Sequence, residues 1–151
     1  VTVVVGDKTL VRNVDYKVAW YKNDKPGMGE VVVKGIGDYE GRIVTKFEIK
    51  PAVPTNLKLD PRDTGFRVRW TASESDISGY QVVFATDPEF KNIVRAKRVG
   101  KEKVTFTGLQ PGTYYVKVRS YVTEEETNID MIFITGIINS LYSNIGTITV
   151  K

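Results

Sequence analysis

Tyrosines and basic residues alternate with valines near residue 115, in a pattern that suits a sugar or an anion. In the run from Tyr114 to Tyr121, a period of two places Tyr114, Val116 and Val118 on one face of a strand. The opposite, outer face then carries Tyr115, Lys117, Arg119 and Tyr121. Tyrosine rings can stack on sugars, and lysine and arginine side chains can bind anions. We favour the plainer interpretation, a solvated strand face on which basic stems cover exposed rings.

An acidic run, Glu124-Glu125-Glu126 followed by Asp130, offers oxygen ligands of the kind that calcium accepts. Three adjacent carboxylates cannot converge on one ion without a sharp turn, and no Asp-x-Asp-x-Gly pattern supplies that turn. The run therefore predicts a solvated loop.

Two other motifs of catalytic or nucleotide sites are not found. No pair of carboxylates has a spacing that stands out as that of a hydrolase. The glycines Gly35, Gly37 and Gly41 lack the Gly-Lys-Ser or Gly-Lys-Thr ending of a phosphate loop.

The chain of 151 residues contains neither cysteine nor histidine. Without these residues it has no disulfide, no thiolate nucleophile, no thiolate zinc site and no histidine base, so most hydrolase triads are excluded. We predict no catalytic residue, no metal site and no cofactor, and we do not expect the chain to be an enzyme.

The charge is spread evenly along the chain. Residues 1–52 hold 9 of the 22 basic and 7 of the 18 acidic side chains. A nucleic-acid binder usually concentrates its positive charge on one face or arm, so this spread argues against that class. The longest apolar tract, Met131 to Ile134 with Ile137 and Ile138 beyond it, is too short to span a bilayer.

The second half of the chain reads as a series of short strands separated by turns. Apolar residues alternate along each of them, for example Phe66, Val68 and Trp70, then Tyr80, Val82 and Phe84. The expected strands cover Leu57 to Leu59, Phe66 to Trp70, Gly79 to Phe84, Ile93 to Val99, Val104 to Phe106, Tyr114 to Tyr121 and Ile145 to Val150. Seven such strands fit a β-sandwich.

Several residues of this half resemble a fibronectin type III domain, over residues 53–151. They are Pro54 at the start, Trp70 closing the second strand, Tyr80 opening the third, and the turn Leu109-Gln110-Pro111-Gly112 with the tyrosine that follows. Family spacing selects Tyr115 as that tyrosine, whereas the alternation with Val116 and Val118 selects Tyr114. We predict that Tyr114 faces the core.

The first half also reads as strands, at Val1 to Val5, Tyr16 to Tyr21, Glu30 to Lys34 and Ile43 to Ile49. We expect Tyr16, Val18 and Trp20 on one face, with both Tyr16 and Trp20 in the core. With Gly35-x-Gly37-x-Tyr39-x-Gly41, this order resembles part of an immunoglobulin-like repeat of bacterial surface proteins, over residues 1–52. The prolines of Lys50-Pro51-Ala52-Val53-Pro54 predict a short, stiff linker between two domains.

The segment between the last two strands of the second half, residues 122–143, is far longer than a hairpin loop. We expect it to be ordered and to bury its apolar residues against something other than its own sandwich. The expected partner contact consists of Met131, Ile132, Phe133, Ile134, Ile137 and Ile138. The candidates for its partner are the first domain, a second copy of the chain, or another molecule.

Together these features predict an all-β chain, with a fibronectin type III sandwich preceded by a small, partial immunoglobulin-like domain. The two resemblances imply a non-catalytic structural and adhesive module of an extracellular bacterial protein, secreted or bound to the cell wall. Its expected partners are neighbouring domains and a protein or glycan at the cell surface, with self-association as a further expectation and no nucleic acid or membrane insertion. The alternative is an accessory region of an extracellular carbohydrate-active enzyme.

Overall fold

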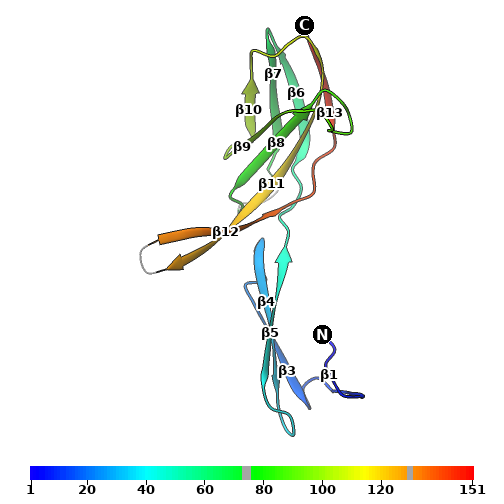
Figure 1. Cartoon of the computed structure of the whole chain (residues 1–151), viewed down its shortest axis with the longest axis vertical. Coiled ribbons are helices and arrows are strands. Elements are labelled where there is room, and N and C mark those ends of the chain that lie inside the picture. Colours follow the sequence, from blue (N-terminus) through cyan, green and yellow to red (C-terminus); the bar gives the residue numbers. More distant parts are fainter. Residues whose placement is uncertain (73–75, 129–130) are drawn as a thin grey trace. The chain divides into compact units, whose positions relative to one another are not determined.

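The computed structural model describes residues 1–72, 76–128 and 131–151, with the side chains of 126–128 and 131–135 excepted. The described chain forms β-strands and no helix (Figure 1). It divides into two compact units, Val1–Ile49 and Lys50–Lys151. The all-β prediction is therefore confirmed.

The first unit contains a two-stranded and a three-stranded antiparallel sheet. Its strands are β1 (Val4–Val5), β2 (Lys8–Thr9), β3 (Tyr16–Tyr21), β4 (Gly27–Gly35) and β5 (Arg42–Ile49). The strand expected at the N-terminus is reduced to Val4 and Val5, which pair with Thr9 and Lys8. The other three predicted strands are present, because each carries the alternating or β-branched residues that a pleated sheet favours.

The aromatic residues of the first unit do not all lie in a core. Tyr16 is buried, and its hydroxyl donates to the Val1 carbonyl oxygen at 3.0 Å. Trp20 is 46% exposed, so its prediction as a core residue is wrong. Its ring instead meets the ring of Phe47 edge to face, with centroids 5.6 Å apart. The Phe47 ring lies over Gly29, where any Cβ would collide with it.

The second unit is built from eight strands in two sheets. They are β6 (Thr55–Arg62), β7 (Gly65–Thr71), β8 (Gly79–Ala85), β9 (Ile93–Val99), β10 (Lys103–Phe106), β11 (Gly112–Asn128), β12 (Met131–Asn139) and β13 (Gly146–Val150). One sheet has the order β10-β7-β6, and the other has the order β12-β11-β8-β9 with β13 paired to β11. All neighbouring strands are antiparallel.

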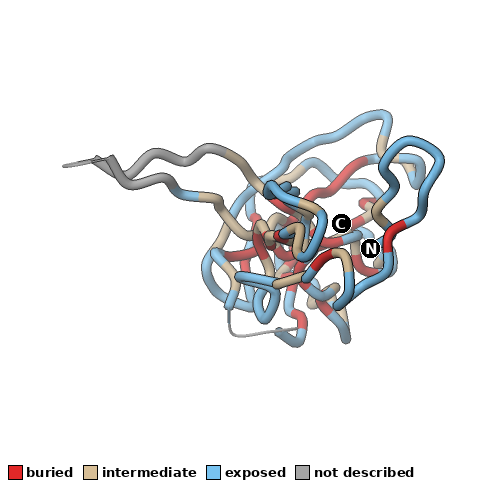
Figure 2. The backbone as a smooth tube through the Cα atoms, turned by 90° about the horizontal axis from the view of Figure 1, so that it is seen from below, coloured by how far each residue is buried: buried red, intermediate tan, exposed pale blue. Residues whose placement is uncertain are grey.

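The two sheets of this unit share one hydrophobic core (buried residues are red in Figure 2). The alternating residues predicted to face inward supply it, among them Phe66 on β7, Phe84 on β8 and Val116 on β11, all fully buried. Residues 50–54 carry no strand and belong to this unit. There the buried Ser120 hydroxyl donates to the Ala52 carbonyl oxygen at 2.6 Å.

Tyr114 fixes the turn that leads into β11. Its ring is 5% exposed and lies 5.9 Å from the ring of Phe66 and 5.7 Å from that of Phe84. Its hydroxyl donates to the Gln110 carbonyl oxygen at 2.8 Å, four residues back along the chain. The prediction that Tyr114, rather than Tyr115, faces the core is confirmed.

Candidate functional site

The predicted long loop after residue 121 is instead a β-hairpin. Strand β11 continues to Asn128, and β12 returns antiparallel beside it, with Tyr121 opposite Asn139 and Asn128 opposite Met131. Residues 122–128 of β11 and strand β12 extend away from the sandwich (Figure 1), and we call these two paired stretches the arm. The loop interpretation of residues 122–143 is therefore wrong for the two stretches that pair, 122–128 and 131–139.

The arm presents open strand edges. In the part of the chain that the structure describes, β12 pairs with β11 alone, and β11 pairs with β8 only from Tyr115 to Tyr121. At Ser78, the residue directly before β8, the backbone N–H donates to the Tyr121 carbonyl oxygen and the hydroxyl accepts the Thr123 N–H, both at 2.9 Å. A two-stranded hairpin is marginally stable by itself, and free edges accept further strands.

Two buried serines hold the base of the arm. After β12 the chain crosses back to β13 through residues 140–145, beside β11. There the Val118 N–H donates to the Ser143 hydroxyl and the Ser120 N–H donates to the Ser140 hydroxyl, both at 3.0 Å. In return, the backbone N–H groups of Ser143 and Ser140 donate to the carbonyl oxygens of Val118 and Ser120. The serine hydroxyls thus take the place of the carbonyls of a neighbouring strand.

The six residues predicted to contact a partner all lie on β12. Met131 to Ile134 pair through their backbones with residues 125–128 of β11. Their side chains lie outside the described part of the structure. Ile137 is half-buried and Ile138 is 5% exposed, opposite Thr123 and Val122. The partner contact itself stays a prediction.

The aromatic and basic face of β11 is present, and two rings from elsewhere join it. The Lys117 ammonium lies 3.8 Å from the ring centroid of Phe90 and 4.2 Å from that of Tyr142. The Arg119 guanidinium lies 4.7 Å from Tyr142, and its Nε donates to the Gln81 side-chain oxygen at 2.8 Å. Tyr121 is covered in the same way by Arg98, at 5.2 Å. On the ring faces that these cations cover, a sugar can stack on Tyr142 or Tyr121 only if it displaces a cation of the chain itself.

Phe90 reaches Lys117 through an unusual backbone conformation. Its φ angle is 59°, in the left-handed region that non-glycine residues rarely occupy. The turn is held by Asp87, whose carboxylate accepts the backbone N–H groups of Lys91 at 3.0 Å and Asn92 at 2.6 Å. These hydrogen bonds lower the pKa of Asp87. Phe90 and Tyr142 lie in segments that connect strands, so the alternation of residues along β11 could not predict that their rings contact Lys117.

Burial between these rings lowers the pKa of Lys117, and the nearby charge of Arg119 lowers it further. We expect Arg119→Gln to raise the pKa of Lys117 towards its ordinary value, because the repulsion is removed while the two rings remain. A titration of the lysine side chains by NMR measures this, with Lys97→Gln as a remote control. A Lys117 pKa unchanged in Arg119→Gln contradicts it. Since folding lowers this pKa, the contribution of Lys117 to stability increases as pH rises through the folded pKa.

The acidic run does not assemble a metal site in the described residues. Glu124 and Glu125 lie on the β11 part of the arm, whereas the Glu126 side chain and Asp130 lie outside what the structure describes. No group of three metal-ligating side chains occurs among the described residues. The described chain also contains no helix long and apolar enough to cross a membrane.

The two sheets packed over one core, closed by the Tyr114 corner, define a β-sandwich. Residues 52–129 match the family model of the fibronectin type III domain. This match covers slightly more than half of the chain, which therefore belongs to the fibronectin type III family. Such domains are typically non-catalytic modules of multidomain proteins. The match ends one residue after β11 in the sequence, so β12 and β13 lie beyond it. The immunoglobulin-like resemblance of residues 1–52 stays a prediction.

Proposed function

We propose that this chain is a structural and adhesive module of a bacterial cell-surface or secreted multidomain protein, and that its arm makes the adhesive contact. The observation that carries this proposal is that β11 and β12 leave the sandwich together and keep open edges. The family membership supports the non-catalytic role.

The arm suits recognition by strand addition. An extended segment of a partner that pairs with β12 forms main-chain hydrogen bonds, which give affinity, while side chains on alternating positions give selectivity. The sequence of β12, Met131-Ile132-Phe133-Ile134-Thr135, combines β-branched and aromatic residues that favour such a strand. A protein strand, from another molecule or from a second copy of the chain, is therefore the occupant that fits this edge best, with surface glycan as a further candidate.

Removal of the arm tests this function. Replacing residues 125–135 with Asn-Gly joins Glu124 to Gly136, which are already paired, through a two-residue hairpin turn. We expect this variant to lose self-association in sedimentation velocity and binding to arrays of matrix proteins and surface glycans. The thermal unfolding of the sandwich should change by only a few degrees, because the core strands end before the arm.

A pair of point variants refines the test. Ile132→Lys with Ile134→Lys should weaken the same association. The control Thr147→Lys with Thr149→Lys adds equal charge at two exposed positions, also two residues apart on one strand, β13, and should not weaken it. An intact chain that is monomeric and binds nothing on the arrays contradicts the proposal. Unchanged binding after removal of the arm contradicts it as well.

A further inference from the structure

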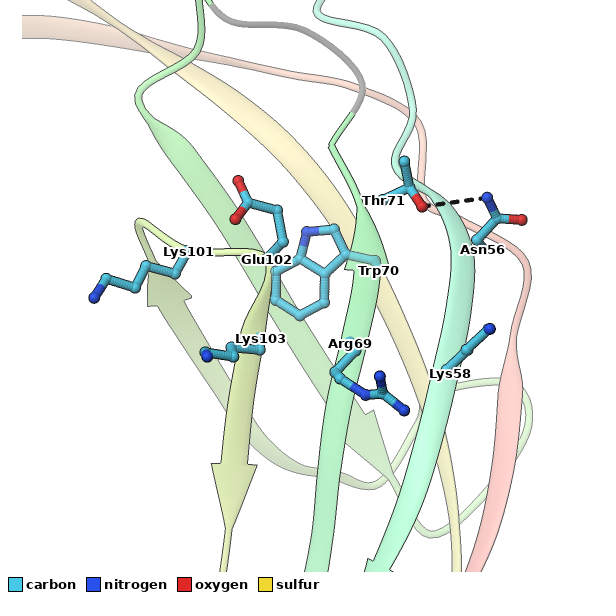
Figure 3. A pocket seen from close by; sticks show the side chains of 8 residues that line it. All are labelled: Asn56, Lys58, Arg69, Trp70, Thr71, Lys101, Glu102 and Lys103. Carbon is cyan, nitrogen blue, oxygen red and sulfur yellow. Dashed lines mark hydrogen bonds between the residues drawn. The ribbon is translucent and has the colours of Figure 1, made fainter.

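A second surface of the sandwich, independent of the arm, carries an uneven share of positive charge. It is an open hollow of about 690 Å³ at the end of the three-stranded sheet (Figure 3). We call it the basic hollow. Its lining consists of Asn56, Lys58, Arg69, Trp70, Thr71, Lys101, Glu102 and Lys103. Four of these eight residues are cationic, and one is a carboxylate.

The cations form a row across neighbouring strands. Arg69 on β7 lies directly opposite Lys103 on β10 and directly opposite Lys58 on β6. Like charges in directly opposed positions repel each other and destabilise a sheet. Three strands about 5 Å apart therefore hold three positive charges on one face. A negatively charged group bound beside this row would relieve the repulsion between its charges.

The chain itself supplies little of that negative charge. Asp60 accepts two hydrogen bonds from Arg69, at 2.7 and 2.9 Å, which neutralises the middle of the row. Among the described residues, Lys58, Lys101 and Lys103 form no ion pair, and all three are exposed. Burial raises the pKa of the Tyr80 hydroxyl, and Glu102, which interacts with this hydroxyl, raises it further. The lysines at both ends of the row thus remain available.

The wall of the hollow has two further features of a binding site. A β-bulge shifts the register of β6 between Thr55 and Lys58, where Asn56 has a φ angle of 53° and donates to the Thr71 hydroxyl at 3.2 Å. Bulges re-aim side chains and occur often beside functional sites. The Trp70 indole N–H is buried and has no hydrogen-bond partner within the described structure. Trp70 alternates with Arg69 along β7 and belongs to the core cluster, so its indole borders the hollow from the core side, beside Glu102 (Figure 3).

We propose that the basic hollow binds a polyanionic glycan through the sulfate or carboxylate groups of its sugars. The lining offers no exposed apolar anchor of the kind that dominates protein interfaces, because its one aromatic residue, Trp70, is 6% exposed. The same burial leaves no ring on which the bases of a nucleic acid stack. Flexible, solvated lysines at intervals across a sheet fit a polymer with repeated charges.

Neutralising the ends of the row tests this site. We expect Lys58→Gln with Lys103→Gln to weaken binding of the full chain to heparin roughly 30-fold at physiological salt, since each cation near an anionic surface contributes about a factor of five. The matched control is Arg95→Gln with Lys97→Gln, which removes the same charge from exposed positions of β9, in the other sheet. Thermal unfolding verifies that both variants remain folded. Polygalacturonate, a carboxylate polymer, and duplex DNA serve as further probes.

NMR locates the bound polymer. On addition of heparin, the indole N–H resonance of Trp70 should shift while that of Trp20 should not. Heparin binding reduced only by the Lys58 and Lys103 changes supports a sulfate site, and the same pattern with polygalacturonate supports a carboxylate site. Equal losses in the control pair, no binding to either polysaccharide, or tighter binding to DNA at equal salt would overturn the proposal.

Discussion

Replacing Trp70 with alanine is expected to lower the free energy of unfolding of the sandwich by about 3–5 kcal/mol. The indole is 6% exposed, and its ring meets that of Tyr80 edge to face, with centroids 5.2 Å apart. Its removal leaves a cavity that the surrounding rings cannot fill. Since the substitution also removes a buried donor without an acceptor, we expect a loss near the lower end of this range.

The second tryptophan provides the matched control. Trp20→Ala deletes the same side chain from a position that is 46% exposed, and in the other unit. We expect it to leave the unfolding of the sandwich unchanged. Differential scanning calorimetry and urea unfolding monitored by circular dichroism measure both variants. Equal effects of the two substitutions would show that Trp70 does not anchor the sandwich core.

Removing the two buried serine hydroxyls is the other change from which we expect a large effect. In Ser140→Ala with Ser143→Ala, the backbone N–H groups of Ser120 and Val118 lose their acceptors inside the protein. Each buried donor left without a partner costs about 1–3 kcal/mol. We therefore expect the double variant to lose about 2–6 kcal/mol and to exchange these two amide hydrogens much faster.

Ser78→Ala is the control for this pair. The Ser78 hydroxyl also accepts a backbone N–H, from Thr123, but Ser78 is exposed, so water replaces the lost acceptor. We expect a loss of about 1 kcal/mol or less. Protection of the Val118 and Ser120 amides that survives in the double variant would mean that another group accepts these hydrogen bonds.

Strands whose own residues alternate could be predicted from the sequence. The bounds of β3 and β9 agree with the expected ranges, and the Tyr114 face follows from its phase with Val116 and Val118. The strands at the arm could not be predicted in this way. Thr123 to Asn128 is polar and acidic, so it reads as a solvated loop, and it becomes a strand only because β12 pairs with it.

The candidate surfaces were predictable to the same limited extent. The period of β11 places Lys117 and Arg119 outward, as observed, but Phe90 and Tyr142 reach them from distant segments. The basic hollow depends on which strands are neighbours, since Lys58, Arg69 and Lys103 are far apart in the sequence and adjacent only in the sheet. Trp20 was predicted to be in a core and is exposed, because periodicity indicates which residues share a face of a strand but not whether another element covers that face.

The serine bridges have a consequence for how this domain tolerates change in length. Ser140 and Ser143, on the segment between β12 and β13, form hydrogen bonds to residues 118 and 120 of β11. Ser78, just before β8, forms hydrogen bonds to residues 121 and 123 of β11. Insertions or deletions farther out on the arm therefore leave the register of the core strands intact. We therefore expect that the arm can be lengthened, shortened or replaced by another hairpin while the sandwich keeps its fold.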